Sequence, residues 1–112
     1  MAISGLSAYF VFTSVNTGHP MQFEWDEAKN QANIRKHGID FRDVPEIFQY
    51  PLLALRDDRI DYEEERWIAI GWLRRLVGVV VYTERRGEVI RIISARKATR
   101  QEVRRYVESI ED

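Results

Sequence analysis

The stretch that decides the fold is residues 88–106, EVIRIISARKATRQEVRRY, in which an apolar strand gives way to a helix. Arg91 stands alone among valine and isoleucine residues, so its side chain must either leave by the opposite face of the strand or pair with an acid. The strand then delivers Ser94, Arg96 and Lys97 just before the helix begins. A strand end that presents a hydroxyl group together with cations predicts an anion-binding site.

Upstream of this stretch, apolar runs separated by short polar breaks predict an antiparallel meander. The last break contains Gly87, where a hairpin favours a positive φ. This hairpin allows more than one pairing, and a slip of one residue moves a side chain to the other face. Whether Tyr82 and Arg91 share a face is therefore open. The expected strands are residues 52–55, 66–72, 76–83 and 89–95, with a short strand-like piece at 23–25.

Capping residues define three helices around these strands. Their order, two helices before the strands and one after them, predicts an α+β fold in which the helices gather against one face of an antiparallel sheet. The expected helices are 27–37, with Asp26 as N-cap and Gly38 as the left-handed C-terminal residue, 41–49, capped by Asp40, and a last helix capped by Thr99.

Composition narrows the function classes. The 112 residues fit one domain, and 45% of them are hydrophobic, which suffices for a core without disulfides or metal. There is no cysteine, and with only His19 and His37 a zinc site would need carboxylates. We therefore expect no metal and no cofactor. The net charge of −1 conceals an arginine-rich last third, so the local field can be basic.

The first twenty residues stand apart from this pattern. Their apolar run at 8–12 is too short to span a bilayer, and no basic segment precedes it as in a secretory signal. We interpret residues 1–20 as a disordered or non-native extension and 21–112 as the functional domain. The alternative is an added edge strand. Either way we expect a cytoplasmic protein with no membrane association.

Several motifs, in order along residues 21–106, resemble those of the BrnT family of toxins. They are FEWD at 23–26, Asn33, KHG at 36–38, ERWIAIG at 65–71, VVVYTE at 79–84 and RIISARKA at 91–98. The resemblance implies a RelE-like ribonuclease, the toxin half of a type II toxin–antitoxin pair. It also implies a BrnA-type antitoxin with a ribbon–helix–helix region, and contact with operator DNA only through that antitoxin.

The chemistry of metal-free RNA cleavage needs a base for the 2′-hydroxyl proton, cations for the charge that builds on the phosphate, and an acid for the leaving oxygen. Arginine suits the phosphate because its fork meets two oxygens and stays charged. The catalytic candidates are Arg91, Arg96, Arg66, His37, Glu65 and Tyr82, and the RNA-binding candidates are Ser94, Lys97 and Arg100.

Each candidate also has a structural interpretation. His37 is favoured at a helix C-terminus by the helix dipole alone. Glu65 belongs to an acidic run typical of a solvated loop, Tyr82 is an ordinary strand residue, and Arg100 lies on a cationic helix face that could instead meet an acidic antitoxin segment. The leading hypothesis is an endoribonuclease that inhibits translation and growth. The alternative is a non-enzymatic module that binds nucleic acid or a partner protein.

Overall fold

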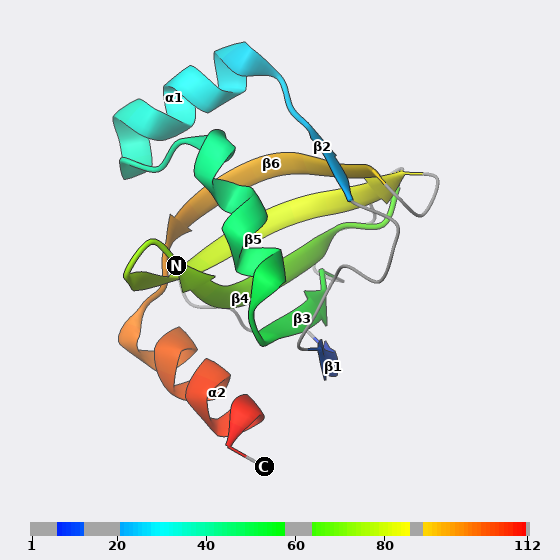
Figure 1. The fold of residues 1–112 in the computed structure, drawn as a ribbon, viewed down its shortest axis with the longest axis vertical. Helices are drawn as coiled ribbons and strands as arrows, with labels where there is room; N and C mark the ends of the chain where they lie inside the picture. The colour runs from blue at the N-terminus through cyan, green and yellow to red at the C-terminus, as the bar shows by residue number, and fades with distance from the viewer. Residues whose placement is uncertain (1–6, 13–20, 58–63, 86–88, 112) are drawn as a thin grey trace.

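The computed structural model describes residues 7–12, 21–57, 64–85 and 89–111. Figure 1 shows a single sheet with helical segments packed against it. The elements are, in chain order, β1 (Ser7–Phe12), β2 (Gln22–Glu24), α1 (Glu27–His37), the 3₁₀ helix η1 (Phe41–Gln49), β3 (Leu52–Arg56), β4 (Trp67–Leu73), β5 (Leu76–Arg85), β6 (Val89–Lys97) and α2 (Arg100–Ile110).

The sheet has six strands in the order β1-β3-β4-β5-β6-β2 (Figure 1). The expected meander is confirmed, because β3, β4, β5 and β6 pair with one another in sequence and antiparallel. The expectation of a purely antiparallel sheet is wrong, since β2 lies parallel to the outer side of β6. This pairing joins segments more than sixty residues apart, so no local signal in the sequence could reveal it.

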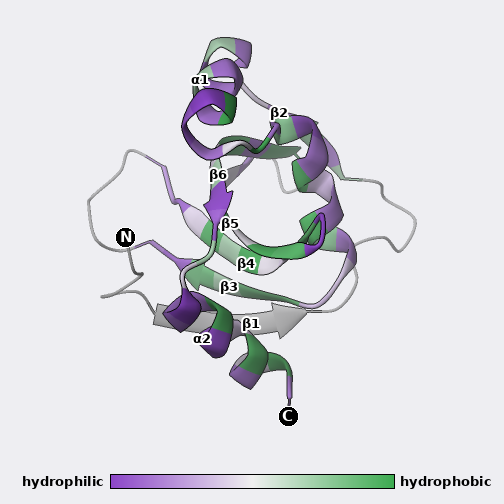
Figure 2. Cartoon of the chain, turned by 90° about the vertical axis from the view of Figure 1, so that its left-hand side faces the viewer, coloured by the Kyte–Doolittle hydropathy of each residue, from purple (hydrophilic) through white to green (hydrophobic). Residues whose placement is uncertain are grey.

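The expectation that the helices gather against one face of the sheet is wrong, because helices cover both faces. On one side, which we call the η1 face, the core includes Phe41 and Ile47 of η1 packed with Val80 and Ile92. On the other side, the α2 face, Tyr106 of α2 packs with a second core cluster that includes Ile68. Figure 2 shows α1 and α2 at opposite ends of the molecule with the sheet between them. The central strands are therefore apolar on both faces, which explains their continuous hydrophobic runs.

The structure confirms the predicted boundaries of the first helix and the predicted start of the last one. They could be predicted because capping depends on residues close in sequence. The Asp26 carboxylate accepts the N–H groups of Ala28 and Lys29, and Gly38 ends α1 with a φ of 73°. Thr99 and Glu102 form a reciprocal capping box at the start of α2.

The second helix has the expected bounds but a different geometry. Residues 41–49 form a 3₁₀ helix, and Phe41, Val44 and Ile47 are fully buried. These three residues are spaced by three, which is the period of a 3₁₀ helix and aligns them on one side. Pro45 lies within this segment and has no N–H to donate to an α-helical bond.

Part of the N-terminal extension joins the sheet. Strand β1 pairs antiparallel with β3, from Ser7 opposite Arg56 to Phe12 opposite Leu52. This pairing corresponds to the alternative of an added edge strand. The rest of the extension, residues 1–6 and 13–20, lies outside the described residues, as does His19.

Candidate functional site

A β-bulge in β6 determines which side chains meet on the α2 face. Val81 pairs with Ser94 and Tyr82 pairs with Ile92, so Ile93 is an extra residue. Without it, strict alternation would place Arg91 and Arg96 on opposite faces. With it, Ile90, Ile92 and Ala95 all point into the η1-face core, while Arg91, Ser94 and Arg96 emerge together on the α2 face.

Arg91 occupies the open end of this face. It lies opposite Thr83 on β5 and Glu24 on β2. Its Nη1 donates to Oε2 of Glu24 at 2.8 Å, and its side chain keeps 31% of its area exposed. The sequence offered two alternatives for Arg91, and both are found. Its side chain leaves by the face opposite to its apolar neighbours, and it pairs with an acid. The rest of its guanidinium remains available to an anion from solvent.

Other charged side chains lie close to the pair formed by Arg91 and Glu24. Arg85 lies 3.7 Å from Oε2 of Glu24, so one carboxylate oxygen faces two guanidinium groups. Arg85 also reaches Glu64 at 3.4 Å. Arg66 directly precedes β4, where it alternates with Trp67 of the η1 face, so its side chain leaves toward the α2 face. Arg66 and Arg91 thus share this face.

Arg96 has a different environment five positions along the same strand. Its Nη1 and Nη2 donate to the two carboxylate oxygens of Glu102 at 2.8 and 2.9 Å, and Nη1 also reaches the carbonyl oxygen of Lys97. Glu102 is 2% exposed and accepts the Thr99 N–H as well. Arg96 therefore fastens α2 to the sheet.

The protonation of Glu102 follows from these contacts. Burial alone would raise the pKa of its carboxyl, but the hydrogen bonds from Arg96 and from the Thr99 N–H outweigh it, and the pKa is lowered. Glu102 is thus a buried carboxylate that stays charged at neutral pH. Both oxygens of a carboxylate already occupy the fork of Arg96, which favours a structural role over the predicted catalytic one.

The RNA-binding candidates lie in the second half of β6 and at the start of α2. Ser94 is half-buried on the α2 face beside Val81. Lys97 ends β6, Arg100 begins α2, and both side chains are exposed. The strand end therefore does present a hydroxyl group and cations.

His37 lies at the Arg96 end of the sheet rather than beside Arg91. Burial lowers the pKa of its imidazole, and the positive charges of Lys36 and Arg96 lower it further. The ring is therefore neutral at pH 7 and able to accept a proton.

Glu65 is directed away from Arg91. Its carboxylate lies 3.2 Å from Arg56, and more than half of its side-chain area is exposed. Arg56 is paired with Trp67, whose ring packs on the η1-face core, so Glu65 is held on that side. Glu65, one of the predicted catalytic residues, therefore lies away from Arg91, in agreement with its interpretation as a solvated residue.

Tyr82 is a core residue. It is 2% exposed on the η1 face, and its ring meets Phe48 edge to face at 5.2 Å between centroids. Burial, and to a lesser degree the charge of Glu84, raises the pKa of its hydroxyl. The question left open by the sequence is thereby answered, because Tyr82 and Arg91 lie on opposite faces, and the burial of Tyr82 favours its interpretation as an ordinary strand residue over a catalytic one.

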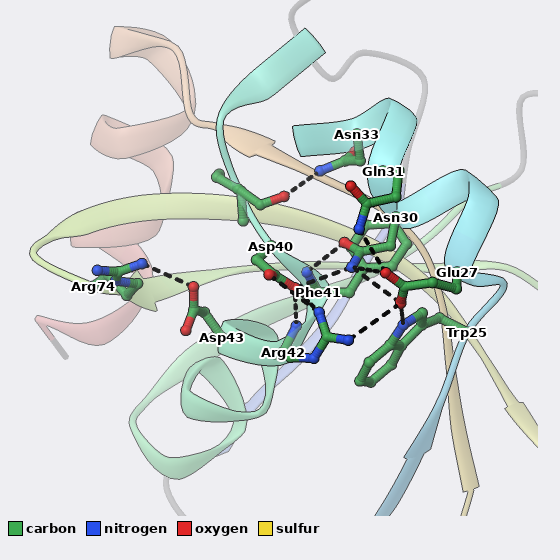
Figure 3. Close-up of polar contacts among 11 residues, drawn as sticks. Trp25, Glu27, Asn30, Gln31, Asn33, Asp40, Phe41, Arg42, Asp43 and Arg74 are labelled. Atoms are coloured by element: carbon green, nitrogen blue, oxygen red, sulfur yellow. Dashed lines mark hydrogen bonds and ion pairs between the residues drawn. The ribbon is translucent and has the colours of Figure 1, made fainter. Parts of the chain in front are cut away.

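Two buried asparagines, for which the sequence pattern predicts no role, hold α1 in place. Asn33 donates to the carbonyl oxygens of Ala95 and Ile39 at 2.9 Å and accepts the Ala95 N–H. Asn30 accepts the Phe41 N–H and donates to Asp40 (Figure 3). Their spacing of three on a helix with few apolar residues was the available signal. The bonds from Asn33 to the backbone of Ala95 hold α1 beside β6. They thereby set the position of His37, the last residue of α1.

The described residues contain no group of three or more His, Asp or Glu side chains that could hold a metal ion. Within the same part of the chain, no helix has the length and apolarity to cross a membrane.

The chain is a small α+β protein with a cationic α2 face, and comparison with known proteins identifies its class. Residues 25–102 match the family described as "Ribonuclease toxin, BrnT, of type II toxin-antitoxin system". A crystal structure of the Brucella abortus ribonuclease toxin BrnT is 33% identical to the chain, with a TM-score of 0.56. The match covers 71% of this chain and 99% of that one. No curated protein matches. The chain belongs to the BrnT family of type II toxins.

Proposed function

We propose that this protein is a metal-independent endoribonuclease with a RelE-like arrangement, and that Arg91 is its principal phosphate-binding residue. The observation that carries this proposal is the state of the Arg91 guanidinium. It is held in place by one hydrogen bond to Glu24, yet it is partly exposed on an open sheet face. A preorganised cation of this kind stabilises charge that grows on a phosphate during reaction.

In the proposed reaction the 2′-oxygen of RNA attacks the adjacent phosphorus and the bond to the 5′-oxygen breaks. The products are a 2′,3′-cyclic phosphate and a 5′-hydroxyl end. A base takes the 2′-hydroxyl proton and an acid returns a proton to the 5′-oxygen. Arg91 holds the non-bridging oxygens, and Arg66 and Ser94 border the same face. His37 is proposed for proton transfer only to RNA that extends along β6 to the Arg96 end, because its neutral imidazole lies there and not beside Arg91.

Lys97 and Arg100 are proposed to guide the RNA backbone toward this face, since both are exposed where β6 meets α2. Contacts of this kind bind phosphates without reading sequence and weaken as salt is added.

Purified protein incubated with RNA in excess EDTA tests the central claim. We expect cleavage to continue, with cyclic phosphate ends, and Arg91→Ala to abolish most of it. Arg104→Ala is the matched control, because Arg104 is exposed on α2. Absence of cleavage by folded wild-type protein, or cleavage only after metal is restored, would reject the proposal.

The proposed partner is a BrnA-type antitoxin with a ribbon–helix–helix region, through which alone the complex would meet operator DNA, in the cytoplasm. Expression of the chain by itself should inhibit translation and arrest growth, and co-expression of the antitoxin should relieve the arrest. Unimpaired growth with folded, soluble toxin present would contradict this.

A second candidate function follows from the positions of Glu65 and Tyr82. Neither lies beside Arg91, so fewer proton-transfer groups surround the cationic face than the sequence predicts. This favours, as the alternative, a non-enzymatic module that binds nucleic acid or a partner protein. It would be supported if Arg91→Ala weakened RNA binding while wild-type protein cleaved no RNA.

A further inference from the structure

One carboxylate interrupts the cationic α2 face at its open end. Oε2 of Glu24 lies 2.8 Å from Nη1 of Arg91 and 3.7 Å from Nη1 of Arg85. The two arginines come from neighbouring strands, so a single oxygen atom occupies the space between two guanidinium groups. A phosphate oxygen makes the same kind of charge-assisted contact with arginine.

A hydroxyl group without a partner lies opposite Arg91, on the strand that also carries Arg85. Thr83 is directly opposite Arg91 on β5 and is 1% exposed. Its Oγ1 is the buried side-chain polar atom that lacks a hydrogen bond in the described part of the chain. A buried hydroxyl is costly to leave unpaired. The hydroxyl is covered in the free protein, so it can become a neutral donor beside the two cations only when the side chains above it move.

We propose that Arg85, Arg91 and Thr83 form a cradle for one RNA phosphodiester, and that Glu24 is a built-in competitor that the phosphate must displace. The proposal rests on the proposed function for the nature of the ligand. Glu24 is displaceable because its side chain is 40% exposed, and a half-exposed ion pair is held only weakly. A carboxylate and a phosphate cannot share the same guanidinium groups without mutual repulsion.

The competitor role is tested with Glu24→Gln, which keeps the shape of the side chain and removes its charge. The measurement is the Kd of a fluorescent 2′-O-methyl RNA, which cannot be cleaved through its 2′-oxygen. We expect about fivefold tighter binding than wild type, the gain from removing an ion pair of the upper strength seen at surfaces. The matched control is Glu108→Gln, an equal charge change at an exposed position on α2, which should leave Kd within about twofold.

The expected gain should vanish in the double variant Glu24→Gln with Arg91→Ala. Unchanged or weaker binding by folded Glu24→Gln would overturn the proposal, as would an equal gain in Glu108→Gln. Loss of cleavage with unchanged binding in Glu24→Gln would make the carboxylate a proton-transfer group instead of a competitor. If wild type cleaves no RNA but Glu24→Gln still binds more tightly, the proposed function fails and this inference stands.

Thr83→Val tests the third member of the cradle. Valine replaces an unpaired buried hydroxyl by a methyl group, so the melting temperature should be unchanged or higher. Binding of the same RNA should weaken severalfold, because one donor to the phosphate is lost. If Thr83 had only a structural role, the substitution would not weaken RNA binding while leaving the melting temperature unchanged or higher. Unchanged RNA affinity in folded Thr83→Val would remove the hydroxyl from the cradle and overturn that part of the proposal.

Discussion

The two ends of β6 carry the same side chain on the same face in opposite states. Arg96 places two N–H groups on the two oxygens of Glu102, which is almost wholly buried. Arg91 places one N–H on one oxygen of Glu24, whose side chain is 40% exposed. A guanidinium whose fork is filled by a buried carboxylate stabilises the fold, whereas one with a single exposed partner can exchange it for a ligand.

The largest expected effect is loss of stability in Arg96→Ala. Without Arg96, the Glu102 carboxylate is buried and loses its cationic partner, so the free energy of unfolding should fall by about 3–5 kcal/mol. Urea denaturation followed by circular dichroism measures this. Arg104→Ala serves as control and should change stability by no more than about 0.5 kcal/mol. A stable Arg96→Ala protein that has lost only cleavage would restore Arg96 to the catalytic role predicted from sequence.

The second prediction concerns Arg91→Ala, whose effect should fall on activity rather than on the fold. Loss of one contact to the growing phosphate charge should reduce the cleavage rate by about 10²–10³, or roughly 3–4 kcal/mol of barrier. The partly exposed pair with Glu24 should cost no more than about 1 kcal/mol of stability. Single-turnover cleavage and urea denaturation on the same preparation separate the two. If Arg91→Ala unfolds the protein, the contrast between the two arginines is wrong.

The third prediction is a pH dependence located at Glu102. Because the folded pKa of this carboxyl lies below the ordinary value of 4.5, its contribution to stability is present above that pH and is lost as pH falls through the lowered pKa. The free energy of unfolding should therefore decline as the pH is lowered from 5 toward about 3. In Glu102→Gln this part of the decline should be absent, and stability at pH 7 should be lower. An identical pH profile in the two proteins would contradict the assignment.

The smallest expected effect is at the attachment of α2 to β3. The Tyr106 hydroxyl donates to the Pro51 carbonyl oxygen at 2.7 Å. Tyr106→Phe removes that bond and leaves a carbonyl without its partner, so stability should fall by about 1 kcal/mol, with cleavage unchanged. Thermal unfolding and the RNA cleavage assay provide the two measurements. A large loss of cleavage would show that the position of α2 matters directly to the active face.

Those parts of the site that depend on short sequence separations were predictable. An isolated charge in an apolar strand predicts that Arg91 either leaves by the face away from Ile90 and Ile92 or pairs with an acid, and the structure shows both. The identity of the acid was not predictable, because Glu24 is sixty-seven residues away and reaches Arg91 only through the parallel pairing of β2. Thr83 was missed for a similar reason, since nothing in its own neighbourhood marks an unpaired hydroxyl.

The sequence by itself determined the helix ends and the meander. Asp26, Gly38 and Thr99 act on backbone groups within three or four residues, so their effect is encoded where they stand. Only the tertiary structure decided which arginine has its guanidinium filled by a buried carboxylate and which side chains lie together on one face of the sheet. The bulge at Ile93, the parallel β2 and the placement of α2 on the far face all arise from contacts between distant segments. Such contacts are chosen by the burial of whole surfaces, which no local pattern of residues specifies.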